Sequence, residues 1–154
     1  MARAPVRALL VLVFPLALAC AHGHTLAPYS EDEELADALE LRASRACPVQ
    51  RAAAGISTSL PPRSFTTDGC SAWIDDGWVS CCVEHDILYW CGGTSDQRRQ
   101  ADEAFRACIA RDHGKGWAST MYWGVRMGGS AWWPTPWRWG YGWPAFHGYE
   151  EAPE

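Results

Sequence analysis

The spacing of apolar and polar residues predicts a helix over residues 30–45. Leu35 lies four residues before a second leucine, so both fall on one face of such a helix. Ser30 and Glu33 have the spacing of a capping box, which satisfies backbone N–H groups in a first helical turn. Residues 52–64 contain Ala-Gly, several Ser and Thr and two adjacent Pro, and this composition predicts a loop.

Two more helices are predicted in the middle of the chain, over residues 78–90 and 94–111. The adjacent Gly92 and Gly93 end the first of them. The second begins with a threonine that forms a capping box with Gln97. Residues at offsets of three or four form one stripe along it, made of Arg98, Asp102, Phe105 and Ile109. These elements predict a mainly α fold.

The last part of the chain is rich in aromatic residues and glycine. A short amphipathic helix is expected first, with apolar positions at Trp117, Met121, Tyr122 and Val125. A segment interrupted by prolines follows and carries five tryptophans: Trp132, Trp133, Trp137, Trp139 and Trp143. These rings could lie at a bilayer interface, stack on sugars or wrap a small core. The acidic end, residues 150–154, is expected to be disordered.

Residues 1–21 form a predicted signal peptide. A basic start leads into an apolar stretch that is too short to span a bilayer, and small residues follow it. Cleavage after Ala19 or Ala21 would release an exported protein, either secreted or periplasmic. Cys20 offers the alternative of a lipid-modified N-terminus, which would anchor the protein to a membrane. No later stretch has the length and apolar character of a transmembrane helix.

Length and charge narrow the class of protein. The chain has 154 residues, which indicates one domain, and its formal charge of −5 disfavours nucleic acid as a partner. Within that domain, residues 22–64 hold the N-terminal helix and loop. Residues 65–112 hold the candidate chemistry, and residues 113–154 form a Trp-rich C-terminal extension.

Cysteine usage favours disulfides. Six cysteines remain when Cys20 is set aside: Cys47, Cys70, Cys81, Cys82, Cys91 and Cys108. An even number suits three disulfides in an oxidising compartment. The alternative is a zinc site built from Cys81, Cys82 and Cys91. Their spacing matches no zinc ribbon or finger, and adjacent cysteines diverge on a helix, so disulfides are the preferred interpretation.

The segment from Cys81 to Tyr89 carries the candidate catalytic residues. On a helix, His85 lies on the same face as Cys81 and Tyr89, four residues from each. An antiparallel second helix would bring Asp102 against His85, and a His fixed by a carboxylate can act as a general base. The chain has no G-x-S-x-G nucleophile motif, so water is the expected nucleophile.

A second group of residues suits a hard cation. Asp86 is rotated by one position from the face of the candidate base, so it can point at a neighbouring loop. With Asp68 and Gly69 it offers oxygen ligands, which suit Ca²⁺ rather than zinc. Asp75 and Asp76 are expected to be turn residues, with ion binding as the alternative.

The segment CCVEHDILY resembles the active-site signature of the secreted phospholipase A2 superfamily, in which two cysteines precede a His-Asp pair and a Tyr. Upstream, TDGCS is similar to the calcium-loop segment of the small prokaryotic members. Downstream, ADEAFRAC is similar to the second active-site helix. The resemblance covers roughly residues 65–112. It implies a small disulfide-stapled fold with two antiparallel active-site helices and calcium-dependent hydrolysis of the sn-2 ester of glycerophospholipids.

The resemblance also implies a role for each matching residue. His85 would be the general base, Asp102 its supporting acid, and Tyr89 a hydrogen-bond donor to Asp102. Glu103 is a poorer match than its neighbour, because the family pattern places the supporting Asp six residues before a cysteine. Asp86 would bind Ca²⁺ through its carboxylate, and the backbone around three loop residues would complete the shell: Asp68, Gly69 and Ser71. The implied disulfides are Cys70 with Cys82, Cys81 with Cys108, and Cys47 with Cys91.

Two departures from the family pattern concern the same region. Family members often have a disulfide between the position before the Tyr and the position before the supporting Asp. Here these positions hold Leu88 and Ala101, so both partners are absent together, as a preserved helix–helix contact predicts. Animal enzymes prefer glycine where this chain has Ser71 and Trp73, and bulk at these positions could close the ion site.

The function expected from these features is phospholipid hydrolysis at the surface of a membrane or micelle. A catalytically silent phospholipase-fold module that binds lipid or a partner protein is one alternative. A Trp-rich envelope or glycan-binding protein, in which the His-Asp helix is only scaffold, is the other.

Overall fold

The computed structural model describes residues 32–152, which form four helices and no strand. The helices are α1 (Glu33–Ala52), α2 (Val79–Cys91), α3 (Ser95–His113) and α4 (Lys115–Gly128). This mainly helical architecture agrees with the class that the sequence predicts. The predicted signal peptide, its cleavage positions and Cys20 lie outside the described residues.

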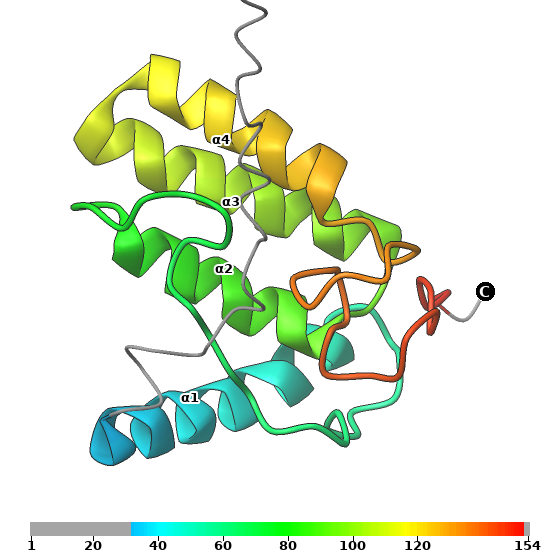
Figure 1. Cartoon of the computed structure of the whole chain (residues 1–154). Helices are drawn as coiled ribbons and strands as arrows, with labels where there is room; N and C mark the ends of the chain where they lie inside the picture. Colours follow the sequence, from blue (N-terminus) through cyan, green and yellow to red (C-terminus); the bar gives the residue numbers. More distant parts are fainter. Residues whose placement is uncertain (1–31, 153–154) are drawn as a thin grey trace, which may run out of the picture.

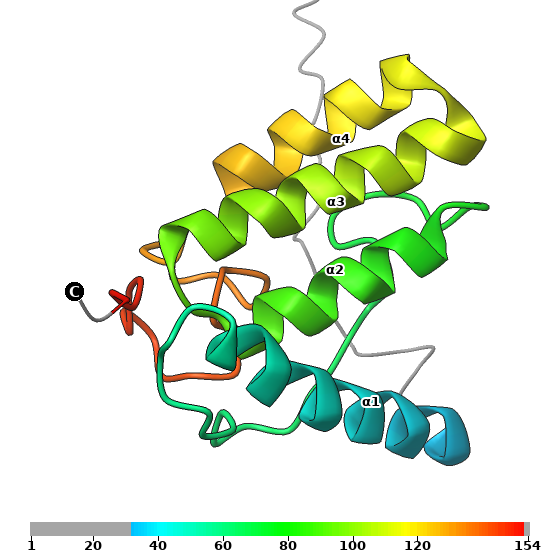
Figure 2. The same cartoon turned by 180° about the vertical axis from the view of Figure 1, so that it is seen from behind.

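The helices lie in one row, in the order α1, α2, α3, α4 (Figures 1 and 2). Helices α2 and α3 run antiparallel at the centre, α1 packs against α2, and α4 packs against α3. After α4 the chain forms irregular turns that return to the C-terminal end of α2. There the N–H of Gly140 donates to the carbonyl of Tyr89, and the N–H of Gly142 donates to that of Trp90.

The predicted boundary between α2 and α3 is confirmed. Gly92 ends α2 with a φ of 70°, a backbone conformation that favours glycine. A Cβ at this position would also lie 2.8 Å from the Cα of Gly140, too close for any side chain. The capping box then opens α3, because the Thr94 hydroxyl accepts from the Gln97 N–H and the Gln97 side chain accepts from the Thr94 N–H.

Helix α1 differs from its prediction at both ends. Asp32 is its N-cap and accepts a backbone N–H in the first turn, whereas the predicted capping serine lies outside the described residues. The helix also continues past residue 45, through Pro48, to residue 52. Tertiary contacts hold this extra length in place, since Cys47 is disulfide-bonded and Arg51 is buried.

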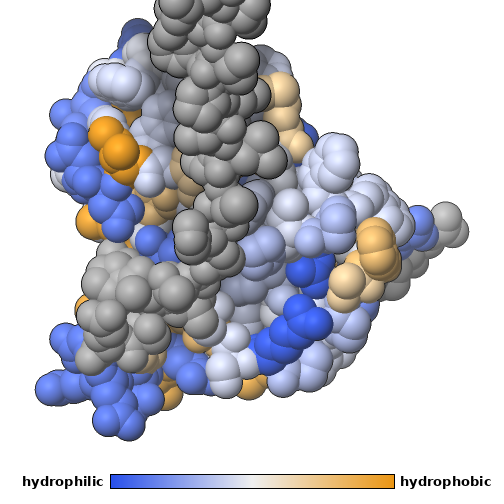
Figure 3. Space-filling view, viewed as in Figure 1, coloured by the Kyte–Doolittle hydropathy of each residue, from blue (hydrophilic) through white to orange (hydrophobic). Residues whose placement is uncertain are grey.

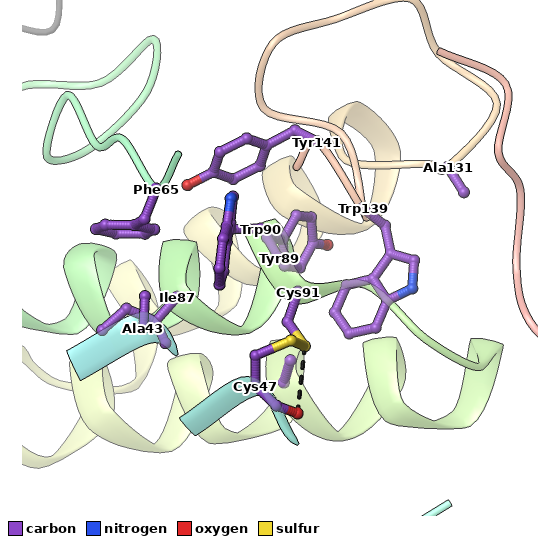
Figure 4. Close-up of a cluster of buried hydrophobic side chains, with 11 residues drawn as sticks. Ala43, Cys47, Phe65, Ile87, Tyr89, Trp90, Cys91, Ala131, Trp139 and Tyr141 are labelled. Atoms are coloured by element: carbon purple, nitrogen blue, oxygen red, sulfur yellow. Dashed lines mark hydrogen bonds between the residues drawn. A yellow bond between two sulfur atoms is a disulfide. The ribbon is translucent and has the colours of Figure 1, made fainter. Parts of the chain in front are cut away.

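Three disulfides fix the helices to one another, with the pairs that the resemblance implies. Cys47–Cys91 joins α1 to α2, Cys81–Cys108 joins α2 to α3, and Cys70–Cys82 joins the preceding loop to α2. Figure 4 shows the first of these within a buried cluster to which α1, α2 and the C-terminal turns all contribute. The antiparallel pair at the centre is therefore cross-linked internally and is also covalently linked to α1 and to the loop before α2.

The tryptophan-rich segment divides between core and surface. Trp139 is buried and packs edge-on against Tyr89, with ring centroids 5.0 Å apart (Figure 4). Trp143 is half-buried and donates from its indole to a backbone carbonyl of α2. Trp132 and Trp133 are 58% and 52% exposed. Wrapping of the core therefore accounts for only some of these rings.

The prediction of a disordered acidic end is wrong for Glu150. Its carboxylate accepts two hydrogen bonds from the Arg51 guanidinium, at 2.6 and 2.7 Å. Its own N–H donates to the carbonyl of Gly93 at 3.1 Å. Because Arg51 is only 1% exposed, its charge requires a partner, and that partner lies 99 residues away in the sequence.

Exposed apolar side chains occur at several places on the surface. No helix in the part of the chain that the structure describes is both long and apolar enough to cross a membrane. Away from the grey atoms, the face in Figure 3 is mostly hydrophilic or intermediate, with scattered hydrophobic residues. Among the described residues, the exposed tryptophans and phenylalanines are Trp73, Trp117, Trp123, Trp132, Trp133 and Phe146.

Candidate functional site

Helices α2 and α3 bring His85 and Asp102 together. The Nε2 atom of His85 lies 2.8 Å from Oδ1 of Asp102, and the Tyr89 hydroxyl donates to the same oxygen at 2.7 Å. All three residues are buried, and the Asp102 side chain is 0% exposed. The structure thus assembles the three residues that the sequence singles out on these two helices.

Hydrogen bonds keep Asp102 ionised despite its burial. Burial alone would raise the pKa of this carboxyl group. The hydrogen bond and the attraction from His85, and further hydrogen bonds from Tyr89 and Arg126, outweigh that effect and lower the pKa below its ordinary value. An ionised carboxylate can only accept, so His85 must donate from Nε2, and in the neutral form of the ring Nδ1 is then the nitrogen that can accept a proton.

Aromatic rings and a cavity surround the His85 imidazole. The Tyr89 and Phe105 rings lie 4.1 and 4.8 Å from it, measured between centroids. His85 lines a cavity of about 330 Å³. Other lining residues come from α2 and the loop before it, from α3, from α4 and from the C-terminal turns: Trp73, Asp86, Phe105, Met121, Gly124 and Trp137. The candidate base therefore stands in the wall of a largely apolar cavity.

Asp86 lies at the same cavity, against the loop before α2. Its Oδ2 accepts from the Thr67 hydroxyl at 2.6 Å. Withdrawal of the carboxyl group from solvent raises its pKa well above the ordinary value, and the hydrogen bond from Thr67 offsets this only in part. The nearby Asp68 and Asp75 carboxylates raise the pKa further by repulsion.

Asp75 closes the loop around Gly69. Its Oδ1 accepts from the N–H of Cys70 at 2.9 Å. A Cβ on Gly69 would lie 2.6 Å from the Asp75 carboxylate oxygens, and the φ of Gly69 is +79°, so only glycine suits this position. Asp75 thus holds this loop together through its side chain, and it also adds negative charge beside Asp86.

The donors in this region fit a hard cation in charge and in atom type. Asp86, Asp68 and the loop backbone provide oxygen atoms only, which is the ligand set of Ca²⁺. A cation would also relieve the repulsion that disfavours the ionised Asp86. Among the described residues, however, no three His, Cys, Asp or Glu side chains converge on one point. Backbone oxygens around Gly69 and Ser71 would therefore have to contribute.

The sequence interpretation missed two partners of the candidate catalytic and ion-binding residues. Arg126 donates to Oδ2 of Asp102 at 2.6 Å, and Thr67 donates to Asp86. A signal for Arg126 exists in the sequence, because it is the only charged residue between Lys115 and Arg138. Thr67 is the first residue of the TDGCS segment, but the resemblance gives it no role of its own.

Replacing Asp86 with Asn is expected to raise the thermal midpoint of the calcium-free protein at pH 7. A carboxyl whose pKa is raised by folding favours the folded state below its ordinary value of 3.8 and loses that advantage as the pH rises through the folded pKa. Asparagine has no charge to desolvate and still accepts from Thr67. The gain should disappear below pH 3.8.

Circular dichroism melting in EGTA at pH 3.5 and at pH 7 measures this difference. Asp112→Asn removes the same charge from an exposed position at the end of α3 and should change little at either pH. A lower midpoint for Asp86→Asn at pH 7 would contradict the prediction.

No protein-family model, curated protein or solved structure matches this chain. The candidate site therefore rests on its own geometry. That geometry comprises a buried His85–Asp102 pair, an apolar cavity beside it and a loop that concentrates carboxylates next to Asp86.

Proposed function

We propose that this chain is an exported phospholipase A2-type hydrolase that cleaves the sn-2 ester of glycerophospholipids. The observation that carries the proposal is the 2.8 Å hydrogen bond between His85 Nε2 and Asp102 Oδ1 in the wall of an apolar cavity. This bond orients the imidazole and leaves Nδ1 as the basic nitrogen. The resemblance of CCVEHDILY to the family signature supports the same assignment.

In the proposed reaction, His85 activates water. Its Nδ1 takes a proton while the water oxygen bonds to the ester carbonyl carbon. Asp102 stabilises the resulting imidazolium through Nε2, as a buried carboxylate does in other His-dependent hydrolases. The bond to the leaving alcohol then breaks, and His85 returns its proton to that oxygen. The products are a fatty acid and a lysophospholipid.

Asp86 and the backbone around Asp68, Gly69 and Ser71 would hold a calcium ion in this proposal. When bound, the ion supplies Lewis-acid stabilisation of negative charge on the ester oxygens and the phosphate. The all-oxygen donor set and the excess negative charge around Asp86 support this part of the proposal.

The surroundings of the site suit a lipid substrate. The cavity is lined by apolar side chains of α3 and α4, which suits an acyl chain. Trp73 lines the cavity and is exposed, and its ring lies 6.1 Å from that of the exposed Trp117. Exposed tryptophans at a cavity mouth favour contact with a lipid–water interface. Three disulfides agree with an exported protein.

Fatty-acid release from mixed phospholipid vesicles tests the proposal. The correctly oxidised protein is expected to release fatty acid with added Ca²⁺ and to lose this activity in EGTA. Asp86→Asn should be inactive under both conditions, whereas Asp112→Asn should behave as wild type. Release that EGTA does not reduce would contradict the calcium assignment. A complete lack of release would favour the catalytically silent lipid-binding module.

A further inference from the structure

The Asp102 carboxylate receives a third hydrogen bond from another helix. His85 and Tyr89 both form their hydrogen bonds with Oδ1 of this carboxylate, whereas the Arg126 guanidinium of α4 donates to Oδ2 at 2.6 Å. Arg126 is half-buried, with 28% of its side chain exposed, and Asp102 has no exposure at all. The two carboxylate oxygens therefore face partners on opposite sides, α2 on one and α4 on the other.

This arrangement fixes how the carboxylate is turned. With partners on Oδ1 alone, rotation about the Cβ–Cγ bond would move that oxygen out of line with His85 and Tyr89. A donor on Oδ2 opposes this rotation. The bond is also charge-assisted, so it is stronger and more directional than one between neutral groups. Arg126 is well suited to holding the acceptor of His85 in place.

The second guanidinium nearby has a different set of partners. Arg98 Nε lies 3.8 Å from Oδ2 of Asp102 and donates to the Tyr89 hydroxyl at 3.0 Å. Its Nη2 donates to the carbonyls of Val125 and Arg126, at 3.0 and 2.7 Å. Arg98 thus fixes the last turn of α4 to α3, and this contact places the backbone from which Arg126 reaches Asp102.

We infer that Arg126 is a positioning residue for the His85–Asp102 pair, acting through its hydrogen bond to Oδ2 of Asp102. Arg126 does not line the cavity and contacts the base only through the carboxylate. Its loss should therefore slow the reaction without weakening substrate binding. The catalytic part of this inference rests on the proposed function, whereas the orientation of Asp102 and His85 can be measured without it.

The test compares Arg126→Met and Arg126→Lys with wild type in the vesicle assay. Methionine keeps the aliphatic part of the side chain and removes the guanidinium group, with its donors and its charge. The expected result is a fall in kcat of about 10²-fold with KM nearly unchanged, since small misplacements of a catalytic group have effects of this size. Lysine should retain most of the activity. Added guanidinium ions should restore part of it to the methionine variant, because the side chain is reachable from solvent.

Arg99→Met is the matched control, since it removes one arginine charge from an exposed position on α3. It should leave kcat unchanged and show no response to guanidinium. If Arg126→Met does not fold, Arg126→Gln takes its place, because glutamine is polar and suits this half-buried position, has no charge, and is two bonds too short to reach Oδ2 of Asp102 as the Nη1 atom of arginine does. An unchanged kcat in the methionine or glutamine variant, or a rise in KM that alone accounts for the loss, would overturn the inference.

Proton NMR of the His85 ring supplies a readout that does not need activity. A ring N–H held against Asp102 should give a downfield signal that exchanges slowly with water. We expect this signal to broaden or vanish in Arg126→Met and to persist in Arg126→Lys. If wild type releases no fatty acid but the signal behaves in this way, the positioning role stands and the proposed function fails. A signal that persists in Arg126→Met overturns the positioning role.

Discussion

Replacing His85 with glutamine is expected to lower calcium-dependent fatty-acid release about 10²- to 10⁴-fold, the usual contribution of a positioned general base. Glutamine can still donate a hydrogen bond toward Asp102 from a position near that of Nε2, so the buried carboxylate keeps a partner. It has no nitrogen that can take a proton from water. The variant should therefore fold as wild type and lose only the chemical step.

Initial rates on mixed phospholipid vesicles with added Ca²⁺ measure this effect, and near-ultraviolet circular dichroism checks the fold. His147→Gln is the matched control, because His147 stacks on Trp143 at the C-terminal turns and takes no part in the candidate site. It should retain wild-type rates. Release by His85→Gln at a rate close to that of wild type would show that another group activates the water.

Local signals in the sequence predict the central part of the fold well. The glycines after α2 and the capping box of α3 act within a few residues, so their effect does not depend on the rest of the chain. The periodicity of α3 also identifies its buried face, since Arg98, Asp102 and Phe105 are all buried. The disulfide pairs came from the resemblance, because cysteine spacing alone allows several pairings.

Features that depend on distant partners could not be predicted from local signals. Helix α1 continues through Pro48 because its last turns are held by Cys91 and Glu150 from elsewhere in the chain. The tryptophans of the C-terminal turns divide between core and surface according to which rings meet α2, and their spacing does not reveal this. The sequence predicts the His85–Asp102 pair. It does not predict that Arg126 of α4 donates to the other oxygen of the Asp102 carboxylate.

The difference between local signals and distant partners also explains why the sequence predicts only part of the candidate site. The candidate base His85 and its supporting acid Asp102 lie on two adjacent helices, and short sequence motifs on these helices identify both residues. The residues that hold the acid and the second carboxylate in place, Arg126 and Thr67, are single side chains on other elements. Their role follows from packing, and a single sequence shows it only where a charge stands alone in an apolar stretch.

Replacing Asp102 with alanine is expected to destabilise the oxidised protein by about 3 to 5 kcal/mol, the usual result of removing one partner of a buried ion pair. The Arg98 and Arg126 guanidinium groups would lose their shared carboxylate. The His85 and Tyr89 donors would lose their buried acceptor. Asp102→Asn should cost less, because the amide oxygen still accepts one or two of these bonds.

Urea denaturation without reductant measures both variants, and Asp96→Ala, which removes a carboxylate from the exposed first turn of α3, is the control. Because folding lowers the pKa of Asp102, its ionised form stabilises the protein above the ordinary value of 3.8, and that stability is lost as the pH falls through the folded pKa. The difference between wild type and Asp102→Asn should therefore be full at pH 7 and shrink below pH 3.8. A difference that does not change between pH 7 and pH 3 would show that shape, and not charge, accounts for the contribution of Asp102 to stability.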